Sequence, residues 1–311
     1  MTSSDPAPVG GAIIDPFADV DLSQLERSLR RPRTLADFSL NALVTGMTLA
    51  SLVPLFSVVL MLAWRGGQKL SAAVFTQLPP APLEQGGGFG NAVAGTLIIV
   101  ALAVAGSVPV GLLTAIFLSQ AEESRAADVV RFCAKVLTGF PSILAGVFAY
   151  GAVVLATGTY SAVAGAVALS ILMLPTIVLT SEDAIRMVPG RMKDAAIGMG
   201  ATSTQVVWMV LLPTALPAIL TGIMLAVARA AGETAPLLFT ALFSNYWLWS
   251  HGHANLMQPT ASLAVLIYNF AGMPFQNQVE LAWAAALVLV LLVLGANIAG
   301  QSLSSRHAAN S

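Results

Sequence analysis

Long stretches without a single charged residue are the feature that most constrains the fold of this chain. Of its 311 residues only 9% are Asp, Glu, Lys or Arg, whereas soluble domains carry about 25%. The stretches that lack all four residue types are 38–64, 85–121, 136–181, 195–228, 234–279 and 281–305. A helix needs about 20 apolar residues to cross about 30 Å of hydrocarbon, and every stretch is long enough for that. The chain is therefore predicted to be an all-α membrane protein.

Six membrane-spanning helices are predicted from these stretches. The turn at Thr157–Tyr160 divides the long third stretch into two spans. The predicted spans are 40–64, 91–118, 137–156, 160–180, 213–243 and 280–299. They lie in a transmembrane domain of residues 36–300, between an N-terminal tail (1–35) and a C-terminal tail (301–311). Residues 181–213 are predicted to form the loop between the fourth and fifth spans.

The basic residues are distributed unevenly between the two sides of the predicted bundle. Only Arg65 and Lys69 fall on the side of the loops 65–90 and 244–277, and Arg229 falls inside the fifth span. All other basic residues lie in the two tails and in the loops after the second and fourth spans. Because Lys and Arg concentrate in cytoplasmic loops, both termini are predicted to be cytoplasmic. The chain is predicted to cross its membrane several times.

Several functions are excluded or disfavoured by the composition. A net charge of -1 argues against a nucleic-acid binder. The single cysteine, Cys133, excludes a disulfide framework, and we expect it to be a small buried residue. His251 and His253 have no cysteine or carboxylate near them in sequence, so no metal site is expected. No phosphate-cradling Gly-rich loop is present, so the chain is not expected to be an ATPase or another enzyme.

The loop 181–213 is unusually apolar for a loop in the cytoplasm. It contains Met187, Met192, Met199 and Trp208 among other apolar residues. Contiguous apolar surface marks partner interfaces, so the loop is predicted to carry a short helix that packs into a groove of another protein. From these residues alone, a bent extension of the fourth span that rests on the bundle is an equally good interpretation.

The spacing within this loop resembles the EAA loop of permease subunits of ATP-binding-cassette importers. The residues that carry the resemblance are Asp194, Ala195, Ala196, Gly200, Leu212 and Pro213. The family usually has Glu at the first of these positions, so Asp194 is a departure. The resemblance implies that these residues couple the chain to an ATPase subunit, on which the loop docks as a coupling helix.

A second informative segment lies inside the predicted fifth span, where Arg229 and Glu233 are four residues apart. A charged residue at the centre of a span costs at least about 2.5–3.5 kcal/mol on insertion scales, so both are expected to face protein or a wet cavity. Residues at this spacing share one helix face and can pair. They form either a structural ion pair or part of an anion pathway, and the residues alone favour neither.

The run from Arg229 to Thr240 resembles the PstA family of phosphate permease subunits. Further segments that resemble this family are Phe75–Pro80, Gly86–Gly88, Gln258–Pro259, Ile267–Phe270 and Glu280–Ala285. The resemblance implies a type I importer permease fold of the MetI-like kind, a location in a bacterial inner membrane and a role in high-affinity phosphate import. It also implies that Arg229, Glu233 and Thr234 lie on the substrate pathway or at its gate.

The resemblance further implies a set of partners. These are a second permease of the PstC type, a dimer of PstB-type ATPase subunits that binds ATP and Mg, and a phosphate-binding protein of the PstS type. No cofactor is expected in this chain itself, and its other partner is membrane lipid. Three alternatives stay open: a permease for sulfate or molybdate, an ion-coupled secondary transporter, and a scaffold that reports the transport state to a sensor kinase.

Overall fold

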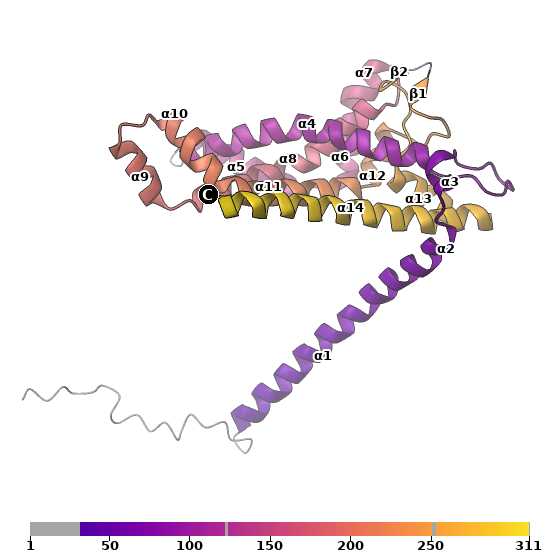
Figure 1. Ribbon diagram of the computed structural model, residues 1–311, viewed down its shortest axis with the longest axis horizontal. Helices are drawn as coiled ribbons and strands as arrows, with labels where there is room; N and C mark the ends of the chain where they lie inside the picture. Colours follow the sequence, from indigo (N-terminus) through magenta and orange to yellow (C-terminus); the bar gives the residue numbers. More distant parts are fainter. Residues whose placement is uncertain (1–31, 122–123, 251–252, 311) are drawn as a thin grey trace, which may run out of the picture. The chain divides into compact units, whose positions relative to one another are not determined.

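The computed structural model describes residues 32–121, 124–250 and 253–310 of the chain, and its described part is almost entirely helical (Figure 1). The one sheet among these residues is an antiparallel pair of two-residue strands, β1 (Trp249–Ser250) and β2 (His253–Ala254). The chain divides into two units, residues 1–58 and 59–311. The first contains most of α1 (Pro32–Met61), a helix that continues through Pro54.

The second unit is a bundle of long and short helices. Its helices are α2 (Gly67–Lys69), α3 (Ala72–Thr76), α4 (Gly90–Gln120), α5 (Arg125–Thr138), α6 (Ser142–Ala149), α7 (Leu155–Thr157), α8 (Ala162–Arg186), α9 (Gly190–Gly198), α10 (Ser203–Val206), α11 (Leu212–Ala231), α12 (Ala235–Thr240), α13 (Leu263–Ala271) and α14 (Gln276–Asn310). Three π-helical turns join neighbouring helices: η2 (Leu62–Gly66), η3 (Tyr150–Val154) and η4 (Val207–Leu211).

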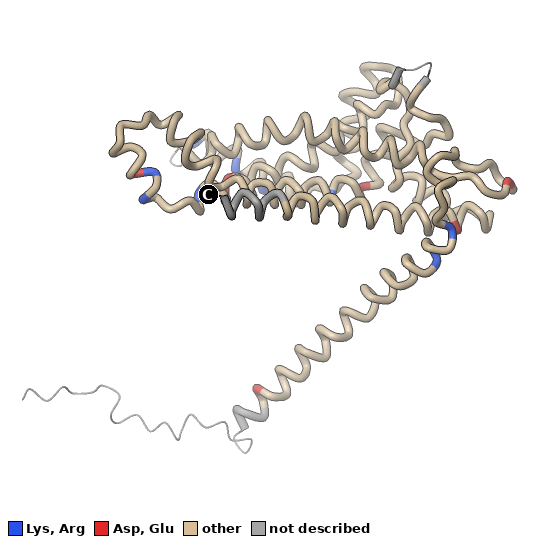
Figure 2. Tube along the Cα trace, in the orientation of Figure 1, with Lys and Arg blue, Asp and Glu red and all other residues tan. Residues whose placement is uncertain are grey.

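Five of the described helical segments are long and apolar enough to cross a membrane: 36–69, 90–120, 162–186, 203–231 and 276–302. A sixth span results if α5 and the segment from α6 to α7 are counted together, although these two parts are bent by 108°. This agrees with the predicted all-helical membrane protein. Figure 2 shows few charged residues along the middle of the second unit and more of them near α9 and α2.

The core of the second unit lies between α4, α8 and α11. Ile99, Leu169 and Ile177 are completely buried there. Small residues allow the helices to approach closely: a Cβ atom on Gly111 would lie 2.7 Å from Ile177 Cγ2, and one on Gly222 would collide with Thr180 Oγ1. Such close contacts between small residues are the usual way in which helices associate in membranes.

The segment 244–277 was predicted to be a loop, and here the prediction is wrong. It contains α13, whose residues Leu263 and Leu266 are completely buried beside Leu281 of α14. The hydroxyl of Thr96 on α4 accepts a hydrogen bond from Leu263 N at 2.8 Å, which fixes the start of α13 inside the bundle. At nine residues α13 is too short to be a span, so the absence of charges in this segment has another cause: burial within the protein.

Candidate functional site

The predicted fifth span, 213–243, is broken rather than continuous. Gly232, Glu233 and Thr234 separate α11 from α12. The amide of Gly232 donates to Arg229 O at 3.1 Å, so the last turn of α11 tightens before the chain changes direction. Pro236 lies in the first turn of α12, where its missing N–H is tolerated, but the same residue would interrupt a continuous helix. Gly232 and Pro236 together account for the break.

Arg229 and Glu233 meet at this break, and the predicted pairing is present. Arg229 Nε donates to Glu233 Oε1 at 3.5 Å, the long end of the hydrogen-bonding range. The side chain of Arg229 is 46% exposed and that of Glu233 is 19% exposed. Thr234 is half-buried and follows immediately, with its carbonyl accepting from Leu237 N and Leu238 N. The structure therefore brings the three predicted pathway residues together, with the guanidinium more accessible than the carboxylate.

The short helix after the break packs against a second broken element. α5 ends at Thr138, and after Pro141 the chain continues as α6 at a sharp angle. A Cβ atom on Gly146 of α6 would lie 2.6 Å from Pro236 Cα, so α6 and α12 touch backbone to backbone. The two elements that are interrupted in the second unit thus contact each other just beyond their interruptions.

Four of the six predicted coupling residues lie at the corner formed by α8, α9 and α10, at the opposite end of the unit from α3 (Figure 1). Asp194 and Ala195 are exposed on α9, whereas Ala196 is 3% exposed and packs in the main core. Gly200 has a φ of +90°, a conformation that favours glycine, and it turns the chain after α9.

Leu212 and Pro213 begin α11 and so end this loop. They lie at the start of the next helix, outside the corner itself. A helix does form where one was predicted, and its buried Ala196 also gives partial support to the view that the loop rests on the bundle. Its docking to a partner stays a prediction.

A buried ionic cluster lies at the base of this corner, and it was not predicted from the sequence. Glu182, near the end of α8, is 2% exposed. Its Oε1 atom lies 2.9 Å from Arg131 Nη2 and 3.1 Å from Arg186 Nη2, and it accepts a hydrogen bond from Arg131 Nε at 3.0 Å. Arg131 also donates to the exposed Asp128 at 3.0 Å. Glu182 and Arg131 are 51 residues apart, so no local pattern could indicate their contact.

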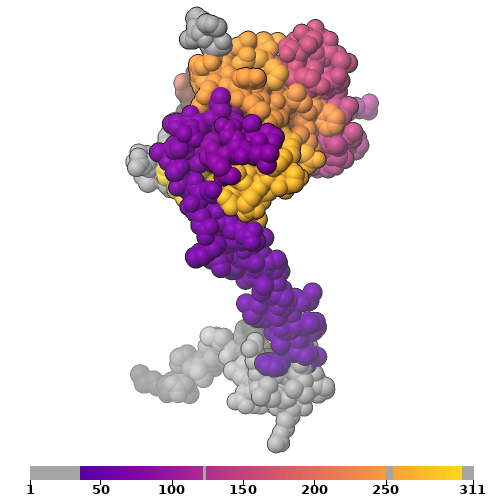
Figure 3. Space-filling view, turned by 90° about the vertical axis from the view of Figure 1, so that its right-hand side faces the viewer, coloured from indigo at the N-terminus to yellow at the C-terminus, as the bar shows by residue number. Residues whose placement is uncertain are grey.

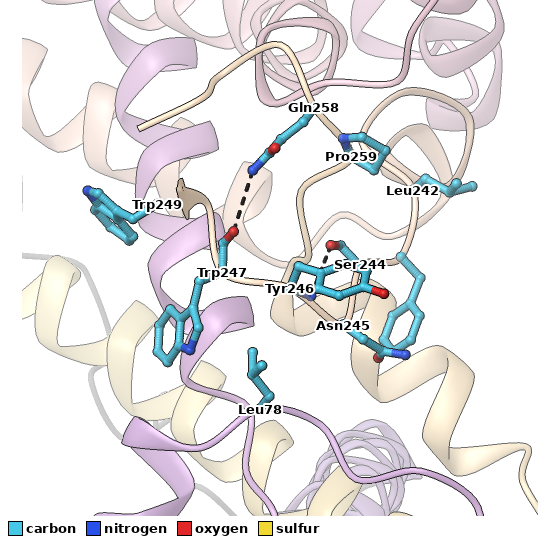
Figure 4. Close-up of a pocket in the computed structure, with 10 residues that line it drawn as sticks. Leu78, Leu242, Ser244, Asn245, Tyr246, Trp247, Trp249, Gln258 and Pro259 are labelled. Atoms are coloured by element: carbon cyan, nitrogen blue, oxygen red, sulfur yellow. Dashed lines mark hydrogen bonds between the residues drawn. The ribbon is translucent and has the colours of Figure 1, made fainter. Parts of the chain in front are cut away.

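The far end of the unit has an aromatic pocket of about 760 Å³, between the segment after α12 and the loop before α4 (Figure 4). Its lining residues are Leu78, Leu242, Phe243, Ser244, Asn245, Tyr246, Trp247, Trp249, Gln258 and Pro259. Figure 3 looks at this end, where the chain before α4 (purple) lies beside the segment after α12 (orange) and the start of α14 (yellow).

Carboxamide side chains hold the walls of this end in place. Asn91 Nδ2 donates to Ser244 O at 2.9 Å and to Tyr246 O at 3.3 Å. Gln258 Nε2 donates to Leu248 O at 3.2 Å. On the neighbouring side, Asn277 Nδ2 donates to Glu84 O at 2.9 Å. These bonds pair carbonyl groups of the loops at this end with side-chain amides, and the bond to Ser244 O is buried.

The expectations for the single cysteine and for the two histidines of segment 244–277 have different outcomes. Cys133 is exposed, so the prediction of a buried residue is wrong, because the residue lies on the outward face of the amphipathic helix α5. His251 and the side chain of His253 lie outside the described part of the structure. Among the described residues, no group of three or more His, Cys, Asp or Glu side chains could hold a metal ion.

Comparisons with known proteins give a consistent result. The sequence profile of the family described as "Binding-protein-dependent transport system inner membrane component" matches residues 107–308. The chain is 39% identical over 236 residues to the phosphate transport system permease protein PstA of Xylella fastidiosa, a match that covers 75% of this chain and 80% of that protein. It is 38% identical over 263 residues to PstA of Haemophilus influenzae, a match that covers 83% of this chain and 91% of that protein.

A solved structure extends this result to the fold. The inward-facing MetNI methionine ABC transporter contains a chain that matches with a TM-score of 0.52 and 21% sequence identity. The match covers 70% of this chain and 93% of that chain. At this level of identity the likeness is one of fold, and it agrees with the predicted importer permease architecture.

Proposed function

Since this chain belongs to the PstA family of phosphate transport permeases, we propose that it forms one half of the pore of an ATP-driven phosphate importer. A permease of this class is a transporter component and works with an ATPase and a substrate-binding protein. We propose a PstC-type permease as the other half of the pore, a PstB-type ATPase dimer that binds ATP and Mg, and PstS as the binding protein.

The end of the bundle that carries α9 is proposed to face the cytoplasm. Arg186, Arg191 and Lys193 lie at or next to this end, whereas Lys69 at the other end is neutralised by Glu280 at 2.7 Å. Clusters of basic residues remain on the cytoplasmic side of bacterial membranes. With this orientation both termini of the chain are cytoplasmic.

The corner at α9 is proposed to be the docking surface for the ATPase. Apolar side chains are conspicuously exposed on and around it: Met187 is 70% exposed, Met199 is 83% exposed and Met209 is 72% exposed. Methionine is common at binding surfaces because its flexible thioether adapts to a partner. ATP binding by the partner then moves α9, and the helices attached to it alternate between inward- and outward-facing arrangements. Hydrolysis resets them.

The observation that carries the proposal of anion transport is the Arg229–Glu233 pair at the break between α11 and α12. The Arg229 side chain is 46% exposed, and a guanidinium has five donors of which Glu233 engages one nitrogen. A guanidinium matches the oxygens of a phosphate and stays charged at any physiological pH. Arg229 can therefore receive a phosphate oxygen while Glu233 remains beside it.

Glu233 is proposed to compete with the substrate for the guanidinium. An arginine without a partner in a pore of low dielectric constant is costly, and it would release a divalent anion slowly. A carboxylate at 3.5 Å offsets the charge when the pore is empty and lowers the affinity for phosphate when it is filled. Thr234, the next residue, completes the proposed pathway segment.

Phosphate uptake by cells that lack this chain tests the proposed function. Cells complemented with the wild-type chain are expected to recover uptake of radiolabelled phosphate, and an excess of unlabelled sulfate or molybdate is expected not to reduce it. Inhibition by either oxyanion would identify the alternative substrate. Uptake that persists without any associated ATPase would instead indicate an ion-coupled secondary transporter. A variant that signals to a sensor kinase without transporting would reveal the regulatory role.

A further inference from the structure

We infer that Glu182 is a positioning residue of the transport cycle, which fastens the corner between α8 and α9 to α5. The inference rests on the proposed docking of an ATPase at α9. It concerns a buried site at the base of that docking surface, where one carboxylate oxygen lies within 3.1 Å of two arginines from different parts of the chain.

Apart from this cluster, the described contact between α5 and α8 is apolar. Ala127, Arg131 and Ala134 share one face of α5, and the two alanines pack with Val178 of α8. Glu182 follows Val178 by one helical turn on α8. Apolar contacts of this kind are non-directional, so they do not by themselves fix the register of one helix against the other. The Arg131–Glu182 bond is the directional contact between the faces.

Stability alone does not explain a buried ionic cluster. Removing charges from water costs several kcal/mol per ion, and apolar replacements are often as stable as the ion pair. What charges supply is a fixed register, because a buried carboxylate that slides away from its arginine is left unpaired. Arg186 is the last residue of α8, so its contact with the same carboxylate also fixes the position from which the chain continues to α9.

From this cluster a continuous series of contacts leads to the Arg229–Glu233 pair. α5 bends at Pro141 into α6, and Gly146 of α6 touches the backbone of Pro236 in α12. Pro236 is three residues beyond Glu233. A displacement of α9 moves the end of α8, and the Glu182–Arg131 bond transmits that movement to α5. From α5 it passes through α6 to the break between α11 and α12.

The test measures phosphate uptake and ATP hydrolysis on the same reconstituted importer. Glu182→Gln, which removes the charge but keeps the shape, is expected to lower the phosphate transported per ATP about tenfold, within the usual range of coupling between distant sites. ATP hydrolysis is expected to continue, because the docking surface is untouched. The matched control is Asp128→Asn, since Asp128 contacts the same arginine but is 66% exposed and does not reach α8. This control is expected to transport as much phosphate per ATP as the wild type.

A charge exchange separates positioning from folding. Arg131→Glu combined with Glu182→Arg re-forms one ion pair between α5 and α8 and is expected to restore part of the phosphate transported per ATP. The rescue is partial because the exchange also places like charges beside Arg186 and Asp128. A loss of uptake and hydrolysis by the same factor, with no rescue by the exchange, would overturn the inference. An unchanged amount of phosphate transported per ATP in Glu182→Gln would overturn it as well.

A distance measurement makes the test independent of transport. The native Cys133 on α5 is exposed and is the chain's single cysteine, so it can carry a spin label together with one at Met199→Cys beside α9. The distribution of distances is expected to be narrow in the wild-type background and broad with Glu182→Gln. Equal widths would overturn the inference. If the wild-type importer transports no phosphate, the proposed function fails, and this distribution alone decides the role of Glu182.

Discussion

Arg229 Nε lies 3.5 Å from Glu233 Oε1 across the end of α11, with the arginine on the helix and the glutamate just beyond it. The side chain of the cation is more than twice as exposed as that of the anion, at 46% against 19%. A substrate oxygen can therefore approach the guanidinium without first displacing the carboxylate. The proposed competition is therefore electrostatic: Glu233 weakens the attraction of the guanidinium for the anion while it stays in place.

Replacement of Glu233 tests that competition. Glu233→Gln keeps the size of the side chain and removes its charge, so phosphate is expected to leave Arg229 more slowly. A barrier to release that rises by about 1.4 kcal/mol would slow transport about tenfold. The measurement is initial-rate uptake at matched membrane levels of the chain. Normal uptake would end the competition hypothesis, and poor assembly of the variant would indicate a purely structural pair.

Docking of the ATPase can be tested at Ala195. This residue is exposed on α9, whereas its neighbour Ala196 is buried, so Ala195→Glu places a charge on the proposed interface without disturbing the core. We expect the variant to lose copurification of the ATPase subunit. Ala126→Glu, at an exposed alanine of α5, is the matched control and should retain it. Loss in both variants, or in neither, would contradict docking at α9.

The close approach of α6 to α12 predicts a large effect of a small substitution. Gly146→Ala adds a Cβ atom 2.6 Å from Pro236 Cα, so backbone must move. Overpacking of this kind costs about 1–3 kcal/mol and should lower the thermal unfolding midpoint of the purified protein. Gly151→Ala, where nothing lies within 4 Å, should not lower it. Equal midpoints for the two variants would show that α6 and α12 separate easily.

The carboxamide of Asn91 is predicted to hold the wall of the aromatic pocket. Asn91→Asp cannot donate to Ser244 O and Tyr246 O, and it places a negative charge beside them. Loss of the buried bond to Ser244 O costs about 1–3 kcal/mol, so limited proteolysis should cut the segment 244–258 at least several-fold faster. Asn255→Asp is the control, because its Oδ1 atom is an acceptor from Met257 N and remains one. Unchanged cleavage in Asn91→Asp would show that the wall does not depend on this residue.

The features that could be predicted from the sequence are those set by local rules. A charge in hydrocarbon is costly wherever it occurs, so the charge-free stretches gave the number of spans to within one. Arg229 and Glu233 pair because they are four residues apart, and the turn at Gly158 forms because glycine adopts its φ of +71° without strain. Neither depends on distant parts of the chain.

Other features depend on contacts that the order of residues does not reveal. α13 has the composition of a span but is buried by α14 and capped by Thr96, which lies 167 residues away from Leu263. Glu182 reads as an ordinary charge at the edge of a loop until α5 brings Arg131 against it. The break at Gly232 is different, because Gly232 and Pro236 are helix-breaking residues within an apolar stretch. These two residues are sufficient to predict that the helix ends near Ala231.

Arg229→Gln provides the most direct test of the central claim, that this chain conducts phosphate past the break between α11 and α12. The measurement is uptake of radiolabelled phosphate in cells lacking the chain, complemented by the wild type or by this variant at equal membrane levels. The account predicts that the wild type restores uptake and that the variant does not. The remaining residue of the pair, Glu233, is negatively charged and cannot bind an anion. Equal uptake by the two proteins would contradict it and would leave Arg229 with a role in packing alone.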